Sequence, residues 1–111
     1  MITKKTNKKK RVKSSAMKFL DSVAGVEFNF SGMLRSIREA DEISQVDFAT
    51  LLGISRQNLC DIEKNRKGVS PERAASFART LGYPETVFVM LALQDEVDRG
   101  GLRLRVSVEA A

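Results

Sequence analysis

The segment that most constrains the fold is a run of 22 residues, Ser44 to Asn65, with the sequence SQVDFATLLGISRQNLCDIEKN. Its first half carries apolar residues at helical spacing, namely Val46, Phe48, Ala49, Leu51 and Leu52. Gly53 follows, and glycine takes the left-handed conformation that ends a helix at no steric cost. Ser55 can cap a second helix, in which Leu59 and Ile62 face inward. Two short amphipathic helices joined by a tight turn are therefore predicted here.

The second of these helices begins with polar side chains that stay outside when its apolar residues are buried. They are Arg56, Gln57, Asn58 and Asp61. Side chains of these types can hydrogen-bond base edges and phosphates. The pattern is that of a helix-turn-helix, whose second helix enters the DNA major groove. The alternative is an ordinary pair of core helices with a polar outer face, and the spacing of Gln45, Ala49, Gly53 and Ser55 disfavours it.

Length and composition exclude several other classes of protein. The 111 residues suit one domain with a modest core. No apolar run approaches the ~20 residues that span a bilayer, and no signal-peptide-like region follows the basic N-terminus, so we expect a cytoplasmic protein. The chain has no histidine and one cysteine, Cys60, which argues against a zinc site and an internal disulfide. No nucleophile is paired with a base, so we expect no enzymatic activity, cofactor or small-molecule ligand.

The net charge of +5 is distributed unevenly along the chain. The first thirteen residues hold seven basic side chains, whereas the other 98 hold 12 basic and 14 acidic ones. A cationic tail of this kind has almost nothing to bury, so residues 1–15 are predicted to be disordered. The tail is either an arm that displaces counterions from phosphate or a solvated terminus.

Capping signals on either side of the central motif predict three further helices, within a domain that spans residues 31–98. The predicted helices run from Ser31 to about Ala40, from Ser70-Pro71 to Gly82, and from Pro84 to Gly100. Serine before a helix, proline in its first turn and glycine after its end are the residues preferred at these positions.

A β-strand is predicted at residues 102–109, where apolar side chains alternate with others. Its apolar face consists of Leu102, Leu104, Val106 and Val108. An unpaired strand edge invites association. The strand is therefore expected to pair either with Val26–Phe30, at the end of a short apolar segment over residues 16–30, or with the same strand of a second copy.

The whole pattern resembles the Cro/repressor (Xre) helix-turn-helix family over roughly Ser31 to Met90. The matching positions are Leu34, Ile37, Arg38, Gln45, Ala49, Gly53, Ser55, Ile62, Glu63, Ser70, Pro71, Leu81 and Gly82. The resemblance implies an all-α, five-helix domain like that of lambda repressor, with an ion pair between Arg38 and Glu63. One departure is Lys64-Asn65, where members of the family often have Asn-Gly.

Residues are assigned to a DNA interface partly through this resemblance. Base edges are expected to be read by Arg56, Gln57 and Asp61. Phosphates are expected to contact Gln45, Ser55, Asn58, Lys64, Arg66 and Lys67. A palindromic operator on double-stranded DNA needs a two-fold dimer. The candidate dimer contacts are Phe88, Leu91 and Leu93 on the last helix, and Leu102, Leu104, Val106 and Val108 on the predicted strand.

The size and the C-terminal strand also resemble the antitoxins of bacterial toxin–antitoxin operons, of the HigA and HipB types. That resemblance implies a transcriptional repressor of its own operon that also neutralises a toxin. The toxin would bind residues 1–30, through the basic tail and an apolar patch of Met17, Phe19, Leu20 and Val23, unless this patch packs on its own domain. The alternatives are a phage or housekeeping repressor without a toxin, and a module that binds only protein.

Overall fold

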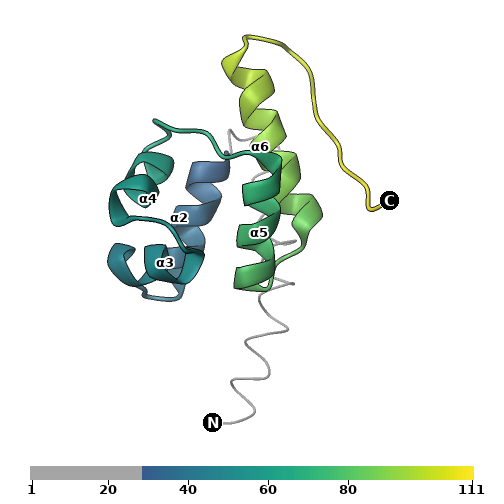
Figure 1. The fold of residues 1–111 in the computed structure, drawn as a ribbon. Helices are drawn as coiled ribbons and strands as arrows, with labels where there is room; N and C mark the ends of the chain where they lie inside the picture. Colours follow the sequence, from purple (N-terminus) through teal and green to yellow (C-terminus); the bar gives the residue numbers. More distant parts are fainter. Residues whose placement is uncertain (1–28) are drawn as a thin grey trace.

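A computed structural model describes residues 29–111, which form five α-helices followed by an extended segment (Figure 1). The helices are α2 (Phe30–Ala40), α3 (Gln45–Leu52), α4 (Arg56–Glu63), α5 (Pro71–Leu81) and α6 (Glu85–Arg99). This arrangement fits the predicted five-helix, all-α helix-turn-helix domain. The predictions for the tail at residues 1–15 and for most of the segment at residues 16–30 lie outside the described residues.

Helix α2 begins one residue before the predicted cap. Its N-cap is Asn29, whose Oδ1 accepts a hydrogen bond from the Gly32 backbone at 2.8 Å and another from Ser31 Oγ at 2.9 Å. Phe30, expected at the end of a strand, is instead the first residue of the helix and is buried. The sequence alone did not separate the two capping side chains, because asparagine and serine are about equally good N-caps.

Helices α4 and α5 begin at the expected serines, Ser55 and Ser70, and α3 begins in the same way at Ser44. The hydroxyl groups of Ser44, Ser55 and Ser70 each accept a hydrogen bond from the backbone N–H three residues later, at 3.0–3.2 Å. Between α3 and α4, Gly53 has a φ of +75°, the left-handed conformation that ends α3 and reverses the chain. These local signals place the two helices of the motif at the predicted positions in the sequence.

The core lies between the five helices, and its fully buried large side chains are Phe48, Phe88, Leu34, Leu59 and Ile62. Helix α3 contributes Phe48 and Ala49 to it. Val46 and Leu51, predicted to share the buried face of α3, are instead 55% and 50% exposed. An eight-residue helix has room for one narrow buried face, and Phe48 and Ala49 occupy it.

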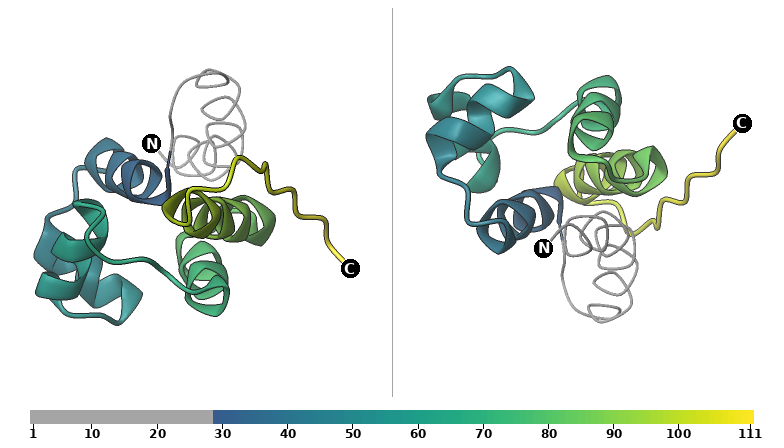
Figure 2. Two further views of the ribbon diagram at one scale, coloured as in Figure 1. Left: turned by 90° about the horizontal axis from the view of Figure 1, so that it is seen from above. Right: turned by 90° about the horizontal axis from the view of Figure 1, so that it is seen from below.

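The predicted strand at residues 102–109 is not seen in the single chain, which corrects the fold prediction for an isolated copy. After Gly101, which has a φ of +72°, the chain is extended but forms no ladder with any other described segment. Leu102 and Leu104 remain 55% and 62% exposed. Both views in Figure 2 show the end of this segment on the side of the molecule away from α3 and α4. Alternation predicts an extended backbone, but a strand also requires a partner strand.

Candidate nucleic-acid interface

Helix α4 presents the polar side chains of its first turn to solvent. Leu59 and Ile62 are buried, and this fixes the rotation of the helix so that Arg56 and Gln57 are exposed at its start. Ser55, the N-cap, is exposed beside them, whereas Asn58 is half-buried. The structure therefore places the predicted base-reading pair together on one accessible turn.

Asp61, the third predicted base-reading residue, faces Gln57 one turn earlier in α4. Gln57 Nε2 donates a hydrogen bond to Asp61 Oδ1 at 3.1 Å, and Arg66 Nη1 lies 3.8 Å from the same oxygen. This contact orients the Gln57 amide and leaves its carbonyl oxygen and second hydrogen available. Glutamine needs both an acceptor and a donor to pair with adenine, so this orientation suits base recognition.

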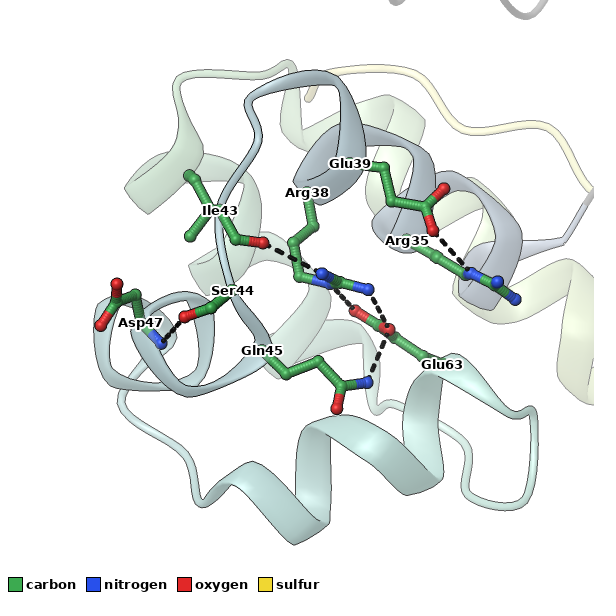
Figure 3. Close-up of polar contacts among 8 residues, drawn as sticks. All are labelled: Arg35, Arg38, Glu39, Ile43, Ser44, Gln45, Asp47 and Glu63. Carbon is green, nitrogen blue, oxygen red and sulfur yellow. Dashed lines mark hydrogen bonds and ion pairs between the residues drawn. The ribbon is translucent and has the colours of Figure 1, made fainter.

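A buried polar network connects the motif to α2 (Figure 3). Arg38 donates to Glu63 through Nε at 2.7 Å and through Nη2 at 3.1 Å, and its Nη1 donates to the Ile43 carbonyl at 3.0 Å. The side chains of Arg38 and Glu63 are only 14% and 3% exposed. The hydrogen bond to Glu63 raises the pKa of Arg38 above its usual value. The network joins the end of α2, the start of α3 and the end of α4.

Gln45, predicted to contact a phosphate, belongs to this same network. Its Nε2 donates to Glu63 Oε1 at 3.1 Å, and Figure 3 shows the amide directed at the carboxylate. One amide hydrogen is used in that bond, and the other is left for a ligand. The first backbone N–H groups of α3 are adjacent, and helix N-termini favour anions. Gln45 is therefore structural as well as a candidate phosphate contact.

The loop between α4 and α5 carries three exposed basic side chains, Lys64, Arg66 and Lys67. Its conformation depends on Asn65, which adopts a left-handed φ of +59°. Asparagine is among the few residues other than glycine that adopt this conformation readily. The departure from Asn-Gly at Lys64-Asn65 is thus accommodated without a glycine.

Arg99, at the end of α6, holds this loop from outside the motif, and the sequence analysis missed it. Its Nη2 donates to Asn65 Oδ1 at 3.0 Å. A side chain at Gly68 would come within 2.5 Å of Arg99 Nη1, so the guanidinium lies directly over this glycine. The two contacts are separated by more than 30 positions in the chain. No local pattern predicts such a pairing.

Phe88 and Leu91, predicted as dimer contacts on α6, are 0% and 5% exposed and belong to the core of a single chain. They are not available to a second copy. Within residues 29–111, no group of three or more histidine, cysteine or acidic side chains is arranged to hold a metal ion. The helices described are all too short or too polar to cross a membrane.

Comparison with known proteins agrees with this geometry. Residues 34–88 match the protein-family model described as Helix-turn-helix. The matched segment contains all of α3, α4 and α5, together with most of α2 and the start of α6. No curated protein and no solved structure matches the chain.

Together with the five-helix fold, this match supports a DNA-binding protein of the helix-turn-helix class. The matched model is of the Cro/repressor (Xre) type, and the match over residues 34–88 supports a role as a transcription regulator.

Proposed function

We propose that this regulator is a sequence-specific repressor that reads an operator through the first turn of α4. The observation that carries the proposal is the exposure of Arg56 and Gln57 on a helix whose orientation is fixed by buried contacts. Arg56 is suited to donate two parallel hydrogen bonds to guanine, and Gln57 to pair with adenine. Asp61 supports base readout by holding the Gln57 amide.

Phosphate contacts surround this turn in the proposal. Ser55 and Asn58 flank the base-reading pair, Gln45 lies at the start of α3, and Lys64, Arg66 and Lys67 lie on the loop after α4. Contacts to phosphates set the position of the protein on the duplex and do not read sequence. In this proposal, Arg56 and Gln57 read the bases, and the polar and basic side chains around them position the protein by binding phosphates.

The test is operator binding by Arg56→Ala and Gln57→Ala, compared with binding to random DNA, with the region upstream of the gene as the first operator candidate. Each variant should lose about 1–3 kcal/mol of discrimination at one base pair. The matched control is Arg79→Ala, an exposed arginine at the opposite end of α5 from the loop. Wild-type ratios in both α4 variants would contradict the assignment.

One helix-turn-helix covers only a half-site, so we further propose that the repressor binds a palindromic operator as a homodimer. Two of the three candidate dimer contacts on α6, Phe88 and Leu91, are core residues and are therefore not available to a second copy. The C-terminal segment lies on the side away from α3 and α4, so pairing there leaves the DNA face of each copy free.

The finer role that we propose is that of an antitoxin, which binds a toxin as well as its operator. Support comes from the sequence of residues 1–30, where seven basic side chains precede the apolar residues Met17, Phe19, Leu20 and Val23. A segment of this composition suits folding on a partner protein. The competing role is a repressor with the same DNA face and no toxin partner.

Coexpression with the product of the neighbouring gene tests the antitoxin role. That product should inhibit growth when expressed alone, and the full chain should restore growth. A variant with Phe19→Ser and Leu20→Ser should fail to restore growth while still binding operator. A harmless neighbour, or full rescue by the variant, would remove the antitoxin role and leave the repressor.

A further inference from the structure

The C-terminal segment is held in an extended conformation by one side chain of α6, Gln94. The Gln94 amide accepts a hydrogen bond from the Val106 backbone N–H at 2.7 Å and donates one to the Leu104 carbonyl at 2.8 Å. Its second amide hydrogen goes to Asp98 Oδ1 at 2.9 Å, which fixes the direction of the amide. The amide thus makes, on one edge of the segment, the pair of bonds that a neighbouring strand would make.

The opposite edge of the segment has no partner in the part of the chain that the structure describes. In an extended chain, the backbone groups of successive residues point to opposite sides. Those of Leu104 and Val106 face Gln94, so those of Arg103, Arg105 and Ser107 face away from it. All three of these residues are exposed. The segment therefore presents a preformed strand edge to solvent.

We propose that this edge pairs with the same edge of a second copy, antiparallel and centred on Val106. The proposal rests on the dimeric repressor proposed above and names the surface that joins the two copies. In this register the hydrogen-bonded pairs are Arg103 with Glu109 and Arg105 with Ser107. The pairs between them are Leu104 with Val108 and Val106 with its own copy.

Charge disfavours one of the two neighbouring registers. Centring the pair on Arg105 instead would place two arginines directly opposite each other, and like charges so placed are destabilising. Centring it on Val106 gives two Arg103–Glu109 pairs and brings apolar side chains together at the positions where strands approach most closely. The segment is therefore complementary to itself, and this favours a second copy over a different protein as its occupant.

Pairing also covers surface that a single chain leaves in water. Leu102 and Leu104 are the most exposed large apolar side chains of the C-terminal segment, at 55% and 62%. Removing apolar area from water stabilises association by roughly 25 cal/mol per Å². The two copies would form a two-stranded ribbon, with the α6 helices outside and each Gln94 on an outer edge.

The first test measures dimerisation of the full chain by sedimentation equilibrium in the absence of DNA. Arg105→Pro removes one N–H from the free edge and leaves the atoms bound by Gln94 intact, and the residue before proline stays extended. This variant should be monomeric where the wild type is dimeric. The control is Arg105→Ala, which removes the same charge but keeps the N–H and should still dimerise. A monomeric wild type, or a wild-type dimer in Arg105→Pro, would overturn the proposal.

The second test reports the register. Arg103→Glu and Glu109→Arg should each weaken self-association by roughly two- to thirtyfold, because each places like charges opposite each other twice. An equal mixture of the two variants should form heterodimers of wild-type strength, since every pair is then opposite in charge. Failure of the mixture to recover would refute this register.

Cross-linking provides an independent check in a Cys60→Ser background. Val106→Cys should form an intermolecular disulfide on oxidation, because the two copies of a centred pair have Cα atoms about 4.5 Å apart. Leu104→Cys should not, since its own copy lies several positions away. Rapid cross-linking at position 104 and none at position 106 would contradict a register centred on Val106.

These measurements separate the interface from the reading of DNA. A monomeric Arg105→Pro chain that keeps Arg56-dependent sequence preference on a half-site would support both proposals. A wild-type protein that dimerises but shows no sequence preference would count against the role of α4 in reading DNA and not against the dimer interface.

Discussion

Among single residues, Arg38 and Glu63 carry the largest stability effect that we predict. Arg38→Ala should destabilise the fold by about 3 kcal/mol, because a Glu63 carboxylate that is only 3% exposed loses its charged partner. Urea denaturation of the variant measures the loss. The double variant Arg38→Met, Glu63→Leu should recover much of it, since it removes both charges from the interior. An unchanged unfolding midpoint in Arg38→Ala would contradict this prediction and would mean that water solvates the Glu63 carboxylate once Arg38 is removed.

Asp95 on α6 should make stability depend on pH. Its carboxylate accepts a hydrogen bond from the Phe30 N–H at 3.1 Å, but burial raises its pKa above the usual value for aspartate. A raised carboxyl pKa means that the folded state binds more protons than the unfolded one, so stability falls as pH rises through that interval. Asp95→Asn lacks this loss. The melting temperature of the variant minus that of the wild type should therefore increase from acid to neutral pH. A difference that stays constant with pH would argue against a raised pKa of Asp95.

The two residues of α3 that sequence analysis placed wrongly in the core share one cause. Val46 and Leu51 are apolar and were placed in the core, yet the buried face of α3 is defined by Phe48 and Ala49. Eight residues provide little more than two turns, so periodicity alone does not choose between adjacent faces. The double role of Gln45 depends on Glu63, 18 positions away, and no spacing rule gives its hydrogen bond.

At the level of elements, the helices of the motif were predictable because their signals are local. A serine cap and a left-handed glycine each act within a few residues, so the starts of α3, α4 and α5 follow from the chain itself. The strand predicted at residues 102–109 was not predictable in this way. Its alternation is a local property, whereas strand pairing depends on a second segment. The contacts of Gln94 and Arg99 were likewise not predictable, because they join segments distant in the sequence.

The loop between α4 and α5 should contribute charge and no sequence preference. Arg66→Gln together with Lys67→Gln should weaken binding to all DNA alike, because exposed basic side chains release counterions from phosphates. The slope of binding affinity against salt concentration should flatten by about one unit for each phosphate that the variant no longer neutralises. Titrations at several salt concentrations, with Arg79→Gln as the control, measure this. A weakening confined to the operator would instead assign the loop to base recognition.

For the whole molecule, the separation of the DNA face from the C-terminal segment predicts a fixed geometry on the operator. Two joined copies present two α4 helices, which fit half-sites about one helical turn apart. Inserting about five base pairs, half a helical turn, between the half-sites moves them to opposite faces of the duplex. Binding should then fall toward the affinity for a single half-site, as measured by gel shift. Undiminished affinity would indicate that the two copies bind independently.

The way in which Gln94 holds the C-terminal segment affects how related regulators can diverge. Its amide contacts the Leu104 carbonyl and the Val106 N–H, so it sets the course of the segment without regard to side chains there. Substitutions at positions 103 and 109 change which partner chain the free edge of the segment can pair with, while the fold and α4 stay intact. After gene duplication, exchanging the two charges in one copy keeps that copy complementary to itself and places like charges opposite each other in every mixed pair. Two such regulators in one cell can thereby be insulated from each other without any change to the residues that read DNA.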